Sequence, residues 1–187
     1  LDAFGGRIRS RPGDDARALA RDLHRQLEQS AILARIERGR FSRRSDRDDT
    51  VDPAGAPTTA SAAMMIPTGN DPACQGPHPI VLYAHGTAAQ RSLNLADTSN
   101  EDNLERLLVA TMFTTQGYIL IAPNYTGYDM SALTYNPYLN ADQEAKDMID
   151  ALTAARSALP TSFAPTVTDS GKLFVTGYSQ GGHVAMA

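Results

Sequence analysis

Several features that would each assign a protein to a particular class are scarce or missing in this sequence. Its 187 residues include no Trp and a single Cys. One Cys cannot form an internal disulfide, which excludes a small disulfide-stabilised scaffold. No apolar run approaches the roughly 20 residues that a membrane-spanning helix needs, so we expect no transmembrane segment. A formal net charge of −4 gives nucleic acid no overall attraction, and we expect no nucleic-acid partner.

Charged residues are concentrated at the N-terminal end of the chain. Residues 1–52 contain 22 of them, including 12 Arg and no Lys, whereas residues 53–187 contain 16. This break predicts a domain boundary near Val51. We expect residues 1–50 to form an Arg/Asp-rich extension that is partly helical or disordered, and residues 51–187 to form a folded domain. The alternative that residues 1–50 are not native to this domain stays open.

Beyond Val51 the hydrophobic pattern alternates between strands and helices. Apolar runs predict strands over residues 58–66, 80–84, 118–122 and 172–176. The last three are nearly continuous in apolar residues, which is typical of strands buried on both faces. Because helices are predicted between these strands, we expect an α/β fold with a mostly parallel sheet and helices on both of its faces.

The two intervening helices have recognisable start and stop signals. Ser99 is the predicted N-cap of the first helix, which should end at Gly117 and bury Leu104, Leu107, Leu108 and Met112. Asn140 is the predicted N-cap of the second helix. That helix should bury a stripe of apolar residues that includes Ile149, and Pro160 should end it.

The last predicted strand leads directly into the sequence Gly177–Tyr178–Ser179–Gln180–Gly181, which has the pattern G-x-S-x-G. A buried strand before the motif and a helix start after it are the context in which this pattern marks a nucleophilic serine. So tight a strand-to-helix turn strains the Ser179 backbone and crowds the residues two before and two after it, where only glycine fits. We therefore predict that Ser179 is a nucleophile. The alternative is that Ser179 lies in an ordinary turn and has no catalytic role.

A second candidate motif, His85–Gly86–Thr87, follows the strand over residues 80–84. Acyl transfer needs donors aimed at the developing oxyanion, and two backbone N–H groups are the usual solution. We predict that the N–H groups of Thr87 and Gln180 form this oxyanion hole. His85 is expected to order the loop rather than to act as a base, because the base follows the nucleophile in this strand–turn–helix arrangement.

The segment 124–140 follows another predicted strand and contains four of the seven Tyr residues. Ligands bind at the carboxyl ends of parallel strands, and aromatic rings with polar tips suit a pocket wall. We predict that His85, Gly86, Tyr125 and Tyr128 contact the substrate. An ordered loop that packs its own tyrosines is the equal alternative. No metal-ligand cluster or phosphate-binding glycine loop occurs, so we expect neither metal nor cofactor.

The sequences PIVLYAHGT, GYILIAPNYTGYD and FVTGYSQGGHVAMA together resemble the alpha/beta-hydrolase superfamily, specifically its bacterial secreted lipase/esterase-like members. The resemblance covers roughly residues 51–187. It implies hydrolysis of a small-molecule or lipid ester by Ser179, with Thr87 and Gln180 as the oxyanion hole and no cofactor. It also favours a secreted or periplasmic location, although no signal peptide is visible. The alternatives are a serine peptidase or thioesterase on the same fold, or a non-catalytic module.

In the family that the sequence resembles, the acid and the base of the catalytic triad follow the nucleophile. Only eight residues follow Ser179, and none of them is Asp or Glu. His183, on the predicted helix after the elbow, is expected to make local contacts only. We therefore expect the chain to be the N-terminal part of a catalytic domain, inactive and poorly soluble by itself, with the triad Asp or Glu and His outside it. Nothing in the sequence indicates an oligomeric state.

Overall fold

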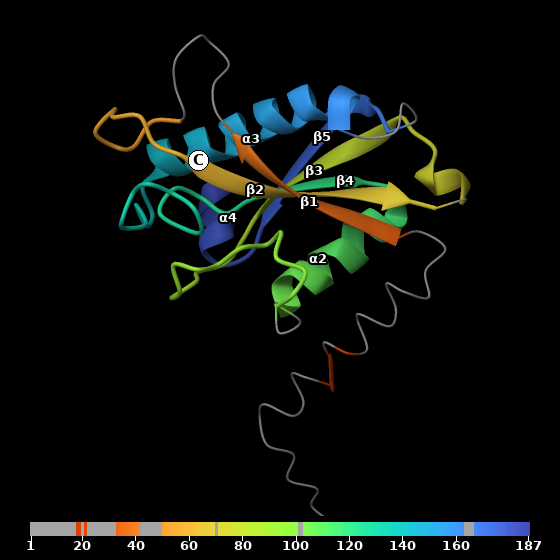
Figure 1. Cartoon of the computed structure of the whole chain (residues 1–187), viewed down its shortest axis with the longest axis horizontal. Coiled ribbons are helices and arrows are strands. Elements are labelled where there is room, and N and C mark those ends of the chain that lie inside the picture. The colour runs from red at the N-terminus through yellow and green to blue at the C-terminus, as the bar shows by residue number, and fades with distance from the viewer. Residues whose placement is uncertain are drawn as a thin grey trace, which may run out of the picture.

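The structure is a computed structural model that describes residues 18–19, 21, 50–69, 71–100, 103–160 and 167–187, together with the backbone alone of 33–41 and 161–162. Within this part a mixed sheet has the strand order β1-β2-β4-β3-β5 (Figure 1). Its strands are β1 Leu33–Phe41, β2 Ala60–Thr68, β3 His78–Ala84, β4 Ile119–Pro123 and β5 Asp169–Gly177. Strand β3 pairs in parallel with β4 and β5, whereas β2 pairs antiparallel with β1 and β4. The expected α/β class is confirmed, but the described sheet is mixed and not mostly parallel, because two of its four strand pairings are antiparallel.

Strand β1 lies inside the charged segment that the sequence placed outside the domain. It pairs with the whole length of β2, from Leu33 opposite Thr68 to Phe41 opposite Ala60. The sheet therefore extends across the boundary predicted near Val51, and at least residues 33–41 are part of it. The helix expected within residues 1–50 falls outside the described residues, apart from residues 18–19 and 21, which are helical.

Alternate side chains of the central strands point to opposite faces of the sheet. On β3, Ile80 and Leu82 pack on the face that α3 (Ala141–Ser162) covers, together with Met148 of that helix. Val81 of β3 packs on the other face with Val109 of α2 (Leu104–Phe113). Figure 1 shows the two helices on opposite sides of the sheet. Two apolar layers therefore hold the sheet between the helices, as the buried runs predicted.

Helix α2 begins and packs differently from the prediction. Its N-cap is Asn103, whose side chain accepts the N–H of Arg106 at 3.1 Å, so Ser99 is not the cap. Leu108 and Met112 are about half exposed, at 46% and 54%, instead of buried. Leu107 is buried as predicted, and Val109 and Ala110 pack against Val81 and Leu120 of the sheet.

Helix α3 begins as predicted, with the Asn140 side chain accepting the N–H of Gln143 at 3.2 Å. Ile149 is 58% exposed, contrary to prediction. The helix also continues through Pro160 to Ser162. Pro160 lies in the last turn, so the helix ends two residues after it instead of at it.

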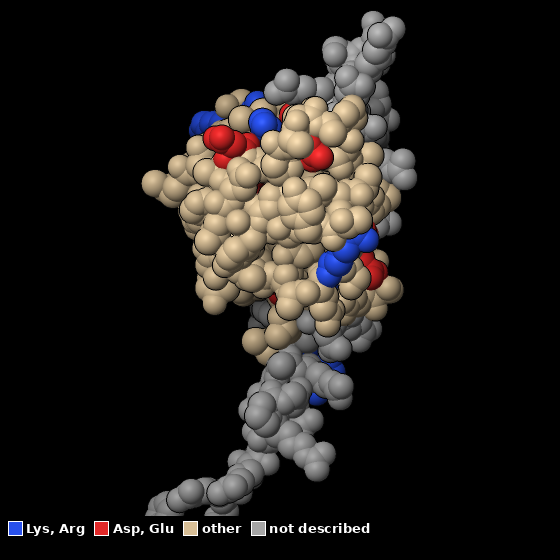
Figure 2. All heavy atoms as spheres, turned by 90° about the vertical axis from the view of Figure 1, so that its left-hand side faces the viewer, with Lys and Arg blue, Asp and Glu red and all other residues tan. Residues whose placement is uncertain are grey.

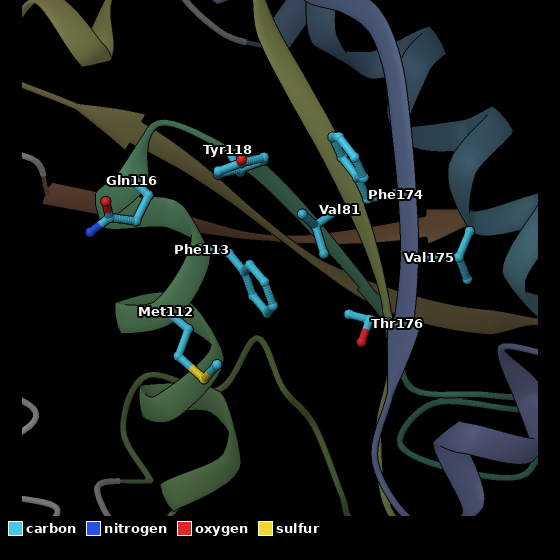
Figure 3. Close-up of a pocket in the computed structure, with 8 residues that line it drawn as sticks. All are labelled: Val81, Met112, Phe113, Gln116, Tyr118, Phe174, Val175 and Thr176. Atoms are coloured by element: carbon cyan, nitrogen blue, oxygen red, sulfur yellow. The ribbon is translucent and has the colours of Figure 1, made fainter.

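Strand β5 is the last strand of the described sheet. The sequence predicted that it is buried on both faces, but it is partly exposed. Leu173, Phe174 and Val175 are 39%, 52% and 48% exposed. Between β5 and α2 lies an open cleft of about 610 Å³, around which Figure 3 shows Phe113, Tyr118 and Phe174. The ring of Tyr118 meets that of Phe174 edge-on, with 6.1 Å between the ring centres. Residues of β5 and α2 line this cleft together with Val81 of β3, Gln116 and Tyr118.

None of the helices in the described part is both long and apolar enough to cross a bilayer. Figure 2 views the molecule from the side on which α4 (Gln180–Val184) lies. The described surface there carries few Lys, Arg, Asp or Glu side chains.

Candidate active site

Ser179 occupies a strained turn between β5 and α4. Its backbone angles are φ 57° and ψ −118°, a conformation that residues with a side chain rarely adopt. A Cβ on Gly181 would overlap the carbonyl oxygen of Ala84 and lie 2.8 Å from that of His85. A Cβ on Gly177 would overlap the carbonyl oxygen of Gly181 and lie 2.9 Å from that of Ala84. The turn therefore has the geometry predicted for a nucleophile elbow.

The elbow packs directly against the loop that follows β3. Tyr178 donates its backbone N–H to the carbonyl oxygen of Ala84 at 3.3 Å. A Cβ on Gly86 would lie 3.1 Å from the ring of Tyr178. Ser179 and Thr87 are both exposed at this end of the sheet. The structure thus brings together the two predicted motifs, which are about 90 residues apart in sequence.

Backbone N–H groups are available on both sides of the elbow. Gly86 donates its N–H to Oε1 of Glu105 at 2.8 Å. Within the described part of the chain, the N–H groups of Thr87 and Gln180 have no hydrogen-bond partner. One of these groups directly follows Ser179, and the other lies in the loop that packs against Tyr178. Their role as an oxyanion hole stays a prediction.

His85 is fully buried beneath the loop. Its ring stacks on Tyr125, with 4.0 Å between the ring centres and 21° between the planes, and meets Tyr128 edge-on. Nδ1 lies 2.7 Å from the carbonyl oxygen of Gly86, and Nε2 lies 3.3 Å from that of Asn124. A neutral imidazole carries a proton on only one nitrogen, and we assign it to Nδ1, which makes the shorter contact. Burial lowers the pKa of the imidazole, which favours its neutral form.

The two predicted substrate-binding tyrosines also hold this loop. The hydroxyl of Tyr125 donates to the carbonyl oxygen of His85 at 3.0 Å, and that of Tyr128 donates to the carbonyl oxygen of Ala88 at 2.7 Å. Burial raises the pKa of both hydroxyls. Contact of His85, Gly86, Tyr125 and Tyr128 with substrate stays a prediction. In this structure all four are buried, and their contacts order the loop.

The other tyrosines of segment 124–140 face solvent. Tyr135 and Tyr138 are 55% and 54% exposed. The Tyr138 hydroxyl lies 3.4 Å from Oγ1 of Thr87, beside the predicted oxyanion donor. The segment therefore contains an inner pair of tyrosines that orders the loop and an outer pair that borders the open surface.

Two glutamates that the sequence analysis did not select contact the site. Glu105 of α2 accepts the hydroxyl of Tyr83 at 2.7 Å, in addition to the Gly86 N–H. Glu144 of α3 is 2% exposed and accepts the side-chain amide of Gln180 at 2.8 Å. Both lie in the first turns of helices, where acidic residues are common for reasons of the helix dipole, so their positions gave no functional signal.

No described histidine is bonded to Ser179. His183 faces Glu144, with Nδ1 2.8 Å from Oε2, in agreement with the local contact that was expected. His78 lies at the opposite end of β3, with Nδ1 2.9 Å from the carbonyl oxygen of Gly117. Both ring nitrogens of His85 face backbone carbonyl oxygens. None of these three rings is arranged as a general base for Ser179.

A mixed α/β sheet with a strained serine turn after one parallel strand and the His85–Gly86–Thr87 loop after its neighbour is the arrangement of the N-terminal part of the alpha/beta-hydrolase fold. The chain has this fold, and solved esterases share it. The ligand-bound structure of the rice cell wall degrading esterase LipA from Xanthomonas oryzae is 34% identical, with a TM-score of 0.73. That match covers 90% of this chain and 40% of the esterase.

Two further solved structures support this assignment. Another structure of the same Xanthomonas oryzae esterase is 34% identical over 92% of this chain and 40% of its own, with a TM-score of 0.72. A structure from Legionella pneumophila, 24% identical with a TM-score of 0.67, covers 90% of this chain and 42% of its own, and shows the fold alone. No protein-family model and no curated protein sequence matches the chain. The chain therefore spans 40–42% of the length of these solved proteins.

Proposed function

We propose that the protein is a serine-dependent hydrolase of carboxylic esters, acting on small-molecule or lipid esters. The observation that carries this proposal is the strained elbow at Ser179, which packs against the loop whose Thr87 N–H has no hydrogen-bond partner among the described residues. The likeness to an esterase at 34% identity favours esters over other acyl compounds. The largely uncharged surface at this end of the molecule also suits an ester substrate.

In the proposed reaction, Oγ of Ser179 attacks the ester carbonyl carbon and the carbonyl oxygen becomes an oxyanion. The N–H groups of Thr87 and Gln180 donate to that oxyanion. Its collapse breaks the bond to the alcohol and leaves an acyl group on Ser179, which water then hydrolyses. A base must accept the Ser179 proton and return it to the leaving alcohol. Because the described histidines have other partners, we propose that this base and its acid lie outside residues 1–187.

His85 would serve this reaction by orienting the Thr87 donor. The carbonyl that it binds belongs to the peptide unit between Gly86 and Thr87. In a trans peptide the C=O and N–H bonds point in opposite directions. A hydrogen bond from His85 to the carbonyl of Gly86 therefore turns the Thr87 N–H away from the buried imidazole.

Labelling with a fluorophosphonate probe tests the proposal, because only an activated serine reacts with it. The full-length protein that contains this chain should be labelled at Ser179, and Ser179→Ala should not be labelled. A panel of p-nitrophenyl esters, thioesters and peptide anilides then separates an esterase from a thioesterase or peptidase. The absence of labelling in a folded full-length protein would contradict a catalytic role for Ser179.

A further inference from the structure

Each of the two segments that would supply an oxyanion donor is tied to one carboxylate from a neighbouring helix. We infer that Glu105 and Glu144 are positioning residues that hold the two donors in place around Ser179. This inference rests on the proposed hydrolysis by Ser179. Glu105 would act through the Gly86–Thr87 loop, and Glu144 through Gln180.

Glu105 determines which N–H of the loop after β3 remains free. Its Oε1 accepts two hydrogen bonds, from the hydroxyl of Tyr83 at 2.7 Å and from the N–H of Gly86 at 2.8 Å. The first bond ties the carboxylate to β3, and the second fixes the start of the loop. With the N–H of Gly86 bound by Glu105 and its C=O bound by His85, both ends of the residue before Thr87 are held.

Glu144 holds the other donor segment in a similar way. Oε1 accepts the side-chain amide of Gln180 at 2.8 Å and the backbone N–H of Leu139 at 3.1 Å. Oε2 faces Nδ1 of His183 at 2.8 Å. Because Gln180 and His183 lie three residues apart on α4, one carboxylate on α3 fixes the rotation of the short helix that carries the Gln180 N–H.

These contacts involve backbone and side-chain groups next to the donors, and neither carboxylate bonds to Ser179 itself. Glu144 is nearly fully buried. A buried carboxylate is costly unless its oxygens are hydrogen-bonded, and here three groups bond to them. The placement of acceptor oxygens, more than negative charge as such, is what these contacts provide. That distinction gives opposite expectations for two conservative substitutions.

The Gln variants keep the length of the side chain and an acceptor oxygen but lose the charge. In Glu105→Gln the amide oxygen can still accept from both Tyr83 and Gly86. In Glu144→Gln the amide NH₂ can face His183, because imidazole can present an unprotonated Nδ1. The Asp variants keep the charge but are one methylene shorter, so their oxygens no longer reach the same partners. If the position of the acceptor oxygens is what matters, the Gln variants should keep their activity and the Asp variants should lose it. If the negative charge is what matters, the Asp variants should keep their activity and the Gln variants should lose it.

The experiment measures kcat and KM for p-nitrophenyl butyrate with the full-length protein, together with the Ki of a trifluoromethyl ketone whose bound adduct carries an oxyanion. We expect Glu105→Asp and Glu144→Asp to lower kcat by about 10- to 100-fold, with KM within about threefold, because a donor displaced by about 1 Å costs that much. The Ki should rise in parallel with the loss in kcat/KM. Both Gln variants should stay within about threefold of the original kcat.

Controls on the same helices separate positioning from general damage. Leu108→Ala on α2 and Asp142→Ala on α3 alter exposed side chains and should leave kcat unchanged. Gln180→Met removes the Glu144 contact from the opposite side, so it tests the bond even if Glu144→Asp does not fold. Gln180→Met should lower kcat by a similar factor. When it is combined with a folded Glu144→Asp variant, it should cause little further loss of kcat, because both substitutions break the same contact.

The outcomes are distinguishable from failure of the proposed function. Full turnover by Ser179→Ala would overturn the proposed function and this inference with it. Loss of turnover in Ser179→Ala, combined with normal kcat and Ki in the Asp variants and in Gln180→Met, would overturn this inference alone. Gln variants that lose as much activity as the Asp variants would also overturn it, because placement would then not be the property that matters.

Discussion

Replacing Gly181 by Ala adds one methyl group at the point where the elbow touches the loop after β3. The new Cβ would overlap the carbonyl oxygen of Ala84 and lie 2.8 Å from that of His85. Both obstacles are backbone atoms, so no side chain can rotate away to relieve the clash. The backbone of α4 and the strand end of β3 must move apart by about 1 Å or more to restore ordinary contact.

Overpacking of this kind costs about 1–3 kcal/mol, and rigid backbone on both sides places Gly181→Ala at the upper end of that range, about 3 kcal/mol. For a domain of this size, each kcal/mol lowers Tm by about 2–4 °C, so we expect a decrease of about 6–12 °C. The same displacement separates the Thr87 and Gln180 donors, and a shift of about 1 Å should lower kcat by about 100-fold.

Gly182→Ala is the matched control, because it adds the same methyl group one residue later on the same helix. A Cβ at Gly182 would have no atom within 4 Å. Replacing a helical Gly by Ala in open space raises the free energy of unfolding by about 0.5–1 kcal/mol. Thermal melts followed by far-ultraviolet circular dichroism should therefore show opposite shifts for the two variants. Equal Tm values for Gly181→Ala and Gly182→Ala would refute the close packing of the elbow against Ala84.

Three further predictions concern other parts of the molecule. Burial raises the pKa of Asp147 to about 6, so the stability gained by protonating its carboxyl is complete below the unfolded pKa near 3.8 and is lost as pH rises through 6. In urea titrations, the free energy of unfolding of the unmodified protein, relative to that of Asp147→Asn, should fall by about 2 kcal/mol between pH 4.5 and 7. The same difference between the two proteins at both pH values would contradict this prediction. Phe174→Lys should reduce aggregation of residues 1–187 alone, measured by light scattering, because Phe174 is half exposed on an edge strand; unchanged scattering would mean that this surface does not drive association. His85→Ala should lower the free energy of unfolding by about 2–4 kcal/mol, because a fully buried ring is removed, yet should keep a larger fraction of kcat than Ser179→Ala; equal losses in kcat would indicate a direct chemical role for His85.

The central strands and the elbow could be predicted because each has a strong local signal. The apolar residues of β3 and β4 form short runs bounded by Pro or Gly, as strands buried on both faces do. The two glycines around Ser179 reflect a steric requirement that the structure displays as backbone contact. In both cases the physical constraint acts on neighbouring residues, so it is visible in the sequence.

Strand β1 and the packing of α2 were predicted incorrectly because their signals are weak or misleading. The sequence LARIERGRF has no apolar run, and its residues pair with β2 residues that are 19 to 35 positions away in the sequence. In α2, Leu107 is buried as predicted, but Leu108 and Met112 are exposed, and Val109 and Ala110 share the buried face. Small residues allow a helix to approach a sheet closely, and hydrophobic size alone does not reveal which face will do so.

The roles of Glu105 and Glu144 had no sequence signal for a different reason. Glu144 meets Gln180 and His183 across 36 and 39 residues, and Glu105 meets Gly86 across 19. These contacts arise only when the sheet order places α2 and α3 beside the ends of β3 and β5. No periodicity or motif spacing in the sequence predicts these contacts, so they can be identified only in the three-dimensional structure.

The central claim is that Ser179 is the nucleophile of an ester hydrolase, and the most direct measurement is the kcat of the full-length protein for p-nitrophenyl butyrate with and without Ser179→Ala. Loss of the covalent step should lower kcat by about 10³-fold or more while KM changes little, because ester binding does not need the hydroxyl. Far-ultraviolet circular dichroism should confirm that the variant is folded. A folded Ser179→Ala protein that keeps most of its esterase activity would contradict the claim.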